Sequence, residues 1–382
     1  MTVVVIVKKI LKKNNKIKKA LRLKKALELF FIFVIYSLYN HRIYIREGQV
    51  VLNNINLYDS VIENLCDELN KILIKIPHNH KLKTEEIRLR NGRPLSISYG
   101  GKDYFVNING NLSSNPSNAV IVNERHIMDT FQLISNYSVY AYTEEIRNGY
   151  ITIRGGHRVG IGGKVIYGLN GVENIRNISS LNIRIGREVL GVSNNILSYI
   201  IKNTNGFYNT LIISPPQCGK TTLLRDIVRN LSNGTEGNFK GFKVSLVDER
   251  SELAGMYNGM AQKDVGMRTD ILDGCLKSDG IIMAIRALSP DIIAVDEIGG
   301  KKDAEAIHEA LRAGIKLMAT VHGSSLEEVR NKSSIRELFT ENIFERFIIL
   351  DRSDGVGTIK EIVDGYSYKP IFFRKSDLNG SS

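Results

Sequence analysis

The sequence is poor in cysteine, with only Cys66, Cys218 and Cys275 among its 382 residues. An odd number of cysteines cannot pair completely, and the sequence has no CxxC or Cys/His spacing typical of a zinc site. This scarcity excludes a disulfide framework and favours a reducing, cytosolic compartment. The content of 43% hydrophobic and 24% charged residues is that of a soluble globular protein.

Beyond its N-terminus the sequence lacks an excess of positive charge. The formal net charge is +12, but residues 1–25 contribute ten Lys or Arg residues and no acidic residue, which leaves +2 for the rest. The basic surface typical of a dedicated nucleic-acid binder is therefore not indicated, and we expect no nucleic-acid partner.

Long hydrophobic runs are also missing. The apolar stretch 30–39 has about half of the ~20 residues that a membrane-spanning helix needs. With the basic residues before it, this stretch allows three interpretations: a membrane-surface anchor, a nucleic-acid arm, or a start site assigned too far upstream. We favour the last, with the surface anchor second. Export is disfavoured because no small-residue cleavage site follows.

The most informative segment is 211–224, LIISPPQCGKTTLL. An apolar run enters a Pro-containing loop, and a helical pattern begins after it. This strand–loop–helix order is typical of a phosphate-binding P-loop, whose backbone N–H groups and helix N-terminus cradle phosphate oxygens. We expect the cradle to consist of Ser214, Pro215, Pro216, Gln217, Cys218, Gly219, Lys220, Thr221 and Thr222.

Two residues of this loop have specific expected roles. Lys220 would reach the β- and γ-phosphates of ATP, and the Thr221 hydroxyl would bind Mg²⁺. The pattern G-x-x-x-x-G-K-[ST] has Ser214 in place of its first glycine. Serine is less suited than glycine to a turn with positive φ, so this replacement is expected to affect the loop.

A second motif follows 76 residues after Lys220. Residues 290–296 form an apolar run that ends in Asp296 and is followed by Glu297, which is the Walker B pattern. Asp296 would hold Mg²⁺, and Glu297 would orient or deprotonate the attacking water.

The elements between and after these motifs refine the prediction. A predicted strand at 243–248 separates them, which indicates the additional-strand, catalytic-glutamate branch of P-loop NTPases with a RecA-like core. Simple P-loop kinases lack this arrangement. His322 ends the next predicted strand, where a γ-phosphate sensor would lie, because the carboxyl ends of parallel strands line the ligand crevice.

We predict an α/β protein in three parts: an N-terminal extension (residues 1–50), a smaller α/β domain (51–200) and a RecA-like ATPase domain (201–382). In the second part the spacing predicts helices at 58–76, 124–135 and 187–202, and strands at 86–93, 103–108, 149–154 and 181–185. The glycines of 155–171 lack G-x-G-x-x-G spacing, so we expect a hairpin there and a structural role for His157. In the third part we expect helices at 221–231, 281–288 and 302–313 and strands at 243–248, 290–296 and 316–321.

Several segments together resemble a known family, the stage III sporulation protein AA family of endospore-forming bacteria. They are EIRLRNGRPL (86–95), GYITIRGGHRVGIGGKV (149–165), SSLNIRIGREVLG (179–191), PPQCGKTTLLRD (215–226), VDERSELAG (247–255), SPDIIAVDEIGG (289–300), ATVHG (319–323) and GTIKEI (357–362). The resemblance extends over residues 57–369 and does not include the first 50 or so.

The resemblance implies a member of the type II/type IV secretion ATPase superfamily. It implies a homo-hexamer, partner membrane proteins of the sporulation channel operon, and a cytoplasmic location in the mother cell, peripheral to the membrane through those partners. By analogy, Asp248 and Glu249 resemble an "Asp box" that arranges Mg²⁺ and water, and His322 resembles a "His box". Glu297 and Glu249 are then rival general bases, of which we favour Glu297.

A ring ATPase also needs a cation offered across the subunit interface. The candidate arginines are Arg154, Arg158, Arg184, Arg187, Arg268 and Arg286, of which we favour Arg184 and Arg187 because they lie near the predicted domain junction. The rival interpretation is a nucleic-acid-dependent ATPase, which only the basic arm supports.

Overall fold

The computed structural model describes residues 44–46, 49–51, 54–169, 171–202, 206–235 and 239–374. The chain divides into two compact units, Met1–Asn56 and Leu57–Ser382. In the first, β1 (Tyr44–Arg46) and β2 (Gln49–Val51) pair antiparallel, while the basic arm and the apolar stretch 30–39 lie outside the described residues. No helix in the described part of the chain is long and apolar enough to cross a membrane.

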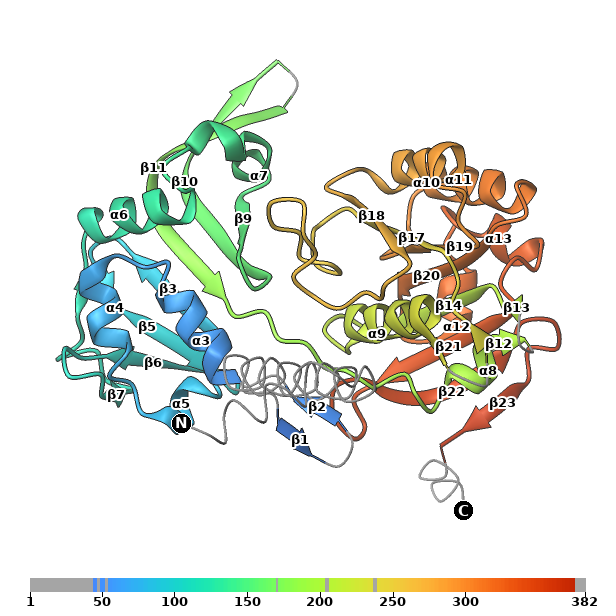
Figure 1. The fold of residues 1–382 in the computed structure, drawn as a ribbon, viewed down its shortest axis with the longest axis horizontal. Helices are drawn as coiled ribbons and strands as arrows, with labels where there is room; N and C mark the ends of the chain where they lie inside the picture. Colours follow the sequence, from blue (N-terminus) through green and yellow to red (C-terminus); the bar gives the residue numbers. More distant parts are fainter. Residues whose placement is uncertain are drawn as a thin grey trace, which may run out of the picture. The chain divides into compact units, whose positions relative to one another are not determined.

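The second unit begins with an antiparallel sheet of seven strands in the order β7-β6-β5-β3-β11-β10-β9 (Figure 1). In strand β3, Ile87 and Leu89 are buried and their neighbours are partly exposed, which is the period-2 pattern of a strand with one face on a core. The strands are β3 (Glu86–Arg90), β5 (Ser96–Tyr99), β6 (Lys102–Val106), β7 (Leu112–Ser113), β9 (Tyr150–Ile153), β10 (His157–Gly168) and β11 (Gly171–Arg184).

Short helices cover this sheet and share its core. Helix α6 begins at Glu124 because the Asn123 side chain accepts the His126 N–H at 2.9 Å, as an N-cap does. The helices are α3 (Asn54–Ile62), α4 (Asp67–Leu73), α5 (His78–Lys81), α6 (Glu124–Ile134), the 3₁₀ helix η1 (Val139–Tyr142) and α7 (Thr143–Arg147); β4 (Arg93–Pro94) and β8 (Ile121–Val122) form a small ladder.

The predicted glycine-rich hairpin is confirmed, because β10 and β11 pair antiparallel from Arg158 with Arg184 to Gly168 with Gly171, with irregularities after Gly162 and Ile166. The single helix predicted at 58–76 is wrong, since it is two helices, α3 and α4. The Asn64 side chain donates to the Ser60 carbonyl and the Asn70 side chain to the Ile62 carbonyl, each at 2.7 Å. Such side-chain bonds compete with the helical backbone pattern and here end α3.

The helix predicted at 187–202 is also wrong. Only α8 (Leu197–Ile200) is helical there, and the preceding residues run irregularly. The Asp226 carboxylate accepts the backbone N–H of Gly191 at 3.0 Å and of Ser193 at 2.8 Å. These N–H groups are therefore held by a side chain far along the sequence instead of by helical carbonyls.

A second sheet of eight strands follows, in the order β18-β17-β19-β20-β14-β21-β22-β23. The first six are parallel neighbours, and β22 and β23 continue the sheet antiparallel. They are β14 (Thr210–Ser214), β17 (Val244–Asp248), β18 (Thr269–Asp273), β19 (Ile292–Val295), β20 (Lys316–His322), β21 (Arg346–Asp351), β22 (Thr358–Asp364) and β23 (Pro370–Phe373). Strand β20 lies between β14 and β19, which is the predicted additional-strand arrangement, whereas β18, β21, β22 and β23 were not predicted.

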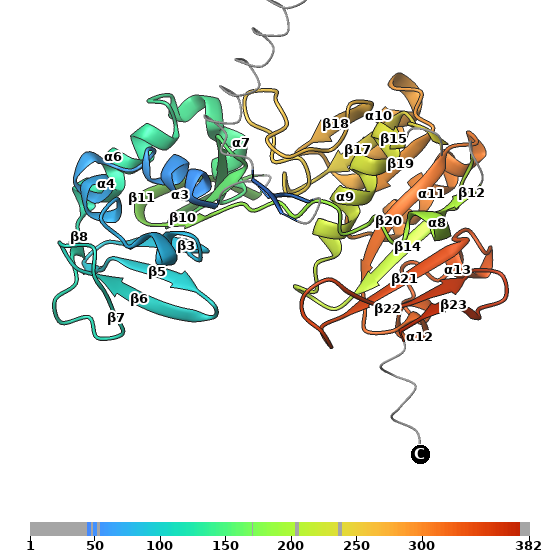
Figure 2. The ribbon, with the colours of Figure 1, turned by 60° about the horizontal axis from the view of Figure 1, so that its bottom comes forward.

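Both faces of this sheet are buried, as expected for parallel strands. In β14, Leu211 and Ile213 belong to one core and Ile212 to the other. Figure 2 shows α9 (Lys220–Asn233) alongside β14, with α11 (Lys301–Arg312) near β20. The remaining elements are α10 (Lys277–Ala287), α12 (Leu326–Arg330), α13 (Glu337–Thr340) and the ladders β12 (Ile201–Lys202) with β13 (Gly206–Phe207) and β15 (Gly234–Thr235) with β16 (Phe239–Lys240).

Candidate functional site

The predicted phosphate loop joins the end of β14 to the start of α9. Its turn is made by Gln217 and Gly219, which have φ of 58° and 87°. Ser214 is instead the last residue of β14 and pairs with His322 of β20. The left-handed backbone therefore falls elsewhere in the loop, and serine at the first glycine position of the motif introduces no φ strain.

The helix that follows the loop, α9, contacts Asp296, the residue directly after strand β19. The Thr221 hydroxyl, in the first turn of α9, donates to Asp296 Oδ2 at 2.9 Å. The Thr320 hydroxyl of β20 donates to Asp296 Oδ1 and accepts the backbone N–H of Glu297 at 2.8 Å. The two residues predicted to bind Mg²⁺ thus face each other, and Thr320 holds both acids that follow β19.

Lys220, Glu297 and His322 form a cluster beside this contact. Lys220 Nζ lies 3.1 Å from His322 Nε2 and 3.6 Å from Glu297 Oε2, and His322 Nε2 lies 2.7 Å from Glu297 Oε1. Arg250 Nη1 is 3.5 Å from the same Oε2. Both oxygens of Glu297 are therefore next to cationic or polar nitrogens.

The backbone of Glu297 has an unusual conformation, with φ of 58°. A positive φ is disfavoured for residues with a side chain and is characteristic of functional sites. Here it turns the chain sharply after β19, so that the side chain of Glu297 reaches Lys220 while its N–H reaches Thr320. His322 contributes a further feature, because its Nδ1 is buried and has no hydrogen-bond partner among the described residues.

Thr320 and Arg250 are site residues that the sequence motifs did not identify. Thr320 is a polar residue in the otherwise apolar part of β20, and it is completely buried. Buried hydroxyl groups usually have a hydrogen-bond partner, so a lone threonine in such a run could have served as a signal. Arg250 directly follows the predicted Asp248-Glu249 pair, and only the strand order brings it to Glu297.

Asp248 and Glu249 have other partners. The Asp248 carboxylate accepts the N–H groups of Glu252, Leu253 and Ala254 at 2.8 to 2.9 Å, which fastens the loop after β17. Burial raises the pKa of Asp248 to about 6. Glu249 pairs with Lys277 of α10. In this geometry Asp248 is a loop-holding residue, and the metal contact predicted for it stays a prediction.

The two favoured arginines are engaged within the antiparallel-sheet region. Arg187 Nη2 donates to the Leu82 and Thr84 carbonyls at 2.8 and 2.7 Å, and Arg184 pairs with Glu86 at 3.3 Å. The other candidates differ in their surroundings: Arg158 pairs with Glu252, Arg268 donates to the carbonyls of Ser232 and Asn233, and Arg154 and Arg286 are exposed.

The donor set at Thr221 and Asp296 suits a magnesium ion. Both donors are hard oxygen atoms, which Mg²⁺ prefers. No group of three or more His, Cys, Asp or Glu residues within the described ranges could hold a metal by itself. A site with one carboxylate and one hydroxyl matches an ion that takes its remaining ligands from substrate phosphates and water.

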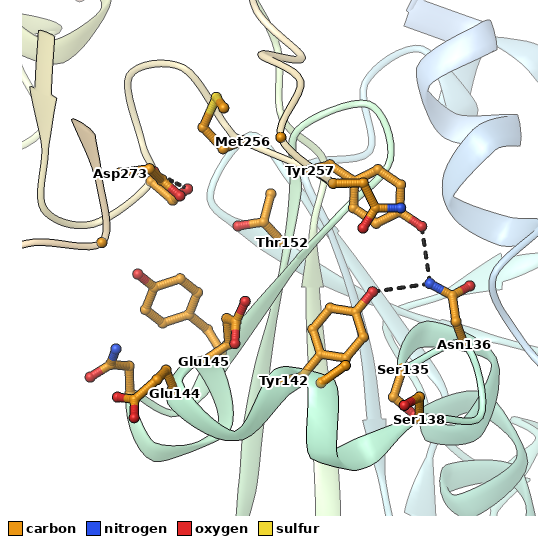
Figure 3. Close-up of a pocket in the computed structure, with 17 residues that line it drawn as sticks. Ser135, Asn136, Ser138, Tyr142, Glu144, Glu145, Thr152, Met256, Tyr257 and Asp273 are labelled. Atoms are coloured by element: carbon orange, nitrogen blue, oxygen red, sulfur yellow. Dashed lines mark hydrogen bonds between the residues drawn. The ribbon is translucent and has the colours of Figure 1, made fainter. Parts of the chain in front are cut away.

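A cavity of about 650 Å³ lies apart from the phosphate loop (Figure 3). In the wall of this cavity, the Asn136 side chain donates to the hydroxyls of Tyr142 and Tyr257 at 3.0 and 3.1 Å. Its lining includes the acidic residues Glu144, Glu145 and Asp273. Three carboxylates would repel a triphosphate, so this cavity does not suit the phosphates despite its size.

Comparisons with known proteins identify the family of the chain and relatives of its fold. The profile of the family described as "Sporulation stage III, protein AA" matches residues 57–369. The chain is 40% identical over 306 residues to "Stage III sporulation protein AA" of Bacillus subtilis (strain 168). The matched region covers 80% of this chain and 95% of that protein. It is 27% identical over 159 residues to "Nucleoside-triphosphatase THEP1" of Methanocaldococcus jannaschii, covering 36% of this chain and 93% of that one.

Among solved structures, the pilus retraction motor PilT with bound ADP is similar, with a TM-score of 0.50 and 14% identity over 82% of this chain and 84% of that one. At this identity the likeness concerns the fold. Together with the strand order, it confirms the predicted RecA-like α/β class. The predicted boundaries at residues 50 and 200 stay predictions.

Proposed function

Since the chain belongs to the sporulation stage III protein AA family, we propose that it is an ATP-hydrolysing motor of a secretion-like channel complex active in endospore formation. One observation carries the proposal. The phosphate loop, the Thr221–Asp296 contact and the Lys220–Glu297–His322 cluster come from three neighbouring strands, β14, β19 and β20, and lie at their carboxyl ends. This is where parallel sheets bind ligands.

In this proposal the backbone N–H groups of Gln217, Cys218 and Gly219 and the N-terminus of α9 hold the phosphates, while Pro215 and Pro216, which have no N–H, shape the loop. Lys220 binds the β- and γ-phosphates, and Thr221 and Asp296 hold Mg²⁺. When bound, the ion neutralises phosphate charge. Thr320 keeps Asp296 in place for this role through its hydroxyl.

Glu297 acts as the general base on water. It accepts a proton from the water while the water oxygen bonds to the γ-phosphorus, and the bond from that phosphorus to the β,γ-bridging oxygen breaks, giving ADP and phosphate. Lys220 lies 3.6 Å from Glu297. The phosphates would draw Lys220 away from the carboxylate and free it for water. His322 would contact the γ-phosphate from β20 and sense its presence.

The wider role rests on family membership. We propose a homo-hexamer that works beside membrane proteins encoded with it, on the mother-cell side, peripheral to the membrane. The transition-state cation would come from a neighbouring copy. We propose Arg154 or Arg286 for it, because both are exposed, whereas Arg184 and Arg187 have partners in their own chain.

A pair of variants tests the proposal. Glu297→Gln preserves shape and removes the proton acceptor, so ATP should still bind while phosphate release falls by about 10²–10⁴-fold. Lys220→Ala should abolish binding. Both are measured in the full chain, by titration with ATP and by phosphate release with and without DNA. Full turnover by purified Glu297→Gln would refute its assignment, and a rate that depends on DNA would favour the rival interpretation.

A further inference from the structure

The loop between β21 and β22, residues 352–357, lies against the outer side of the phosphate loop. The Gly357 N–H donates to the Cys218 carbonyl at 3.1 Å, and Arg352 Nη2 donates to the Gln217 carbonyl at 2.7 Å. A Cβ atom on Gly219 would lie 3.1 Å from the Gly357 Cα and 3.3 Å from Val356 Cγ1. The two backbones are therefore in contact.

This contact orients the phosphate loop. In an anion-binding loop the backbone N–H groups point toward the bound anion. The backbone carbonyls of the loop then point away from the anion and need hydrogen-bond donors from other residues. The hairpin loop supplies them for two consecutive residues, Gln217 and Cys218.

The strand order shows which way a nucleotide would extend. Strand β14 lies between β20 and β21. Under the proposed function the γ-phosphate lies toward β20 and β19, because Glu297 and His322 come from there. The nucleoside is at the opposite end of the phosphate chain, and the element on the other side of β14 is the β21–β22 loop.

The chemistry of this loop suits a base and a ribose. Val356 is 69% exposed, although it is apolar and beside the phosphate loop. Its neighbours are held in place: Asp351 accepts from Ser353, Thr358 donates to the Gly355 carbonyl at 2.8 Å, and Asp354 pairs with Arg374. Sites for small molecules combine such fixed apolar contacts with a few polar groups.

We propose that residues 352–357 are the nucleoside-binding element of this chain, with Val356 packing against the base. Arg352 is a positioning residue that keeps the phosphate loop in shape. The inference rests on the proposed function, of which it names a further part of the same site.

Inorganic tripolyphosphate separates the two roles, because it has the phosphates of ATP without the nucleoside. In calorimetric titrations of the full chain with Mg²⁺, Val356→Ser should bind a non-hydrolysable ATP analogue about fivefold more weakly. Its affinity for tripolyphosphate should match that of the wild type. Arg352→Ala should weaken both ligands, since both use the phosphate loop.

Val165→Ser is the matched control, because Val165 is an exposed valine of β10, and it should change neither affinity. Val356→Ala should give a smaller loss for the analogue, and unchanged thermal unfolding shows that each variant is folded. An unaltered analogue affinity in Val356→Ser, or an equal loss for both ligands, would overturn the inference. A wild-type chain that binds neither ligand would overturn the proposed function itself and the inference with it.

Discussion

Replacing Thr320 by valine is the most direct test of how the site is held together. Valine has nearly the same shape and is equally suited to a strand. The change removes the hydroxyl that donates to Asp296 and leaves the Glu297 N–H without its acceptor, which lies at 2.8 Å. Because Thr320 is completely buried, water cannot easily replace either bond.

The size of the effect follows from these two bonds. A hydrogen bond to a charged group contributes about 1.5–3 kcal/mol, and an orphaned N–H costs about 1–3 kcal/mol when buried. Both bonds involve the same Thr320 hydroxyl, so the two losses do not add fully. The free energy of unfolding should therefore fall by about 2–3 kcal/mol. If Glu297 shifts by about 1 Å, turnover should fall by about 10²-fold.

The assay combines urea unfolding, ATP titration and phosphate release. We expect Thr320→Val to lower kcat more than it weakens ATP binding, because the phosphate loop is untouched while Asp296 and Glu297 both lose their bond to Thr320. Thr320→Ser keeps the hydroxyl and should recover most of the rate. Wild-type turnover in Thr320→Val would show that Glu297 keeps its place without this hydroxyl, and a loss confined to ATP affinity would contradict the positioning role.

Two further predictions concern buried groups away from the site. Burial lowers the pKa of His157 to about 4, with a smaller contribution from the charge of Lys263, so the unfolded chain binds more protons between about pH 4 and 6.5. Stability should be complete above about pH 6.5 and fall by up to about 3 kcal/mol as the pH drops toward 4, and parallel unfolding curves for wild type and His157→Gln would contradict this. The buried Ser245 hydroxyl has no hydrogen-bond partner in the described part of the chain. Ser245→Ala should therefore leave the free energy of unfolding unchanged or raise it by up to about 1 kcal/mol. A clear fall in that free energy, measured by urea unfolding, would show that the hydroxyl does have a partner.

The positions of the phosphate loop and of the acids after β19 could be predicted because each is a contiguous motif next to an apolar strand, and the structure brings Thr221 and Asp296 together as expected. Thr320 gave only the weak signal of a polar residue in an apolar run, and the partners of Thr320 and Arg250 could not be predicted, because they arise only when β20 and β17 flank β19. Sequence spacing shows that a residue is near a strand end but does not show which carboxylate its side chain reaches.

The errors in the fold have the same origin. The segment 187–202 has a helical pattern of apolar residues, but the remote Asp226 takes two of its N–H groups. Local patterns therefore predicted the parallel core well and failed where side chains bind distant backbone.

The position of Lys220 has a consequence for timing. Its ammonium group lies near both Glu297 and His322, and a single ammonium cannot serve this carboxylate and an incoming triphosphate equally. Under the proposed function, Glu297 would be released from Lys220 only when a triphosphate occupies the loop, so the general base would become available together with its substrate.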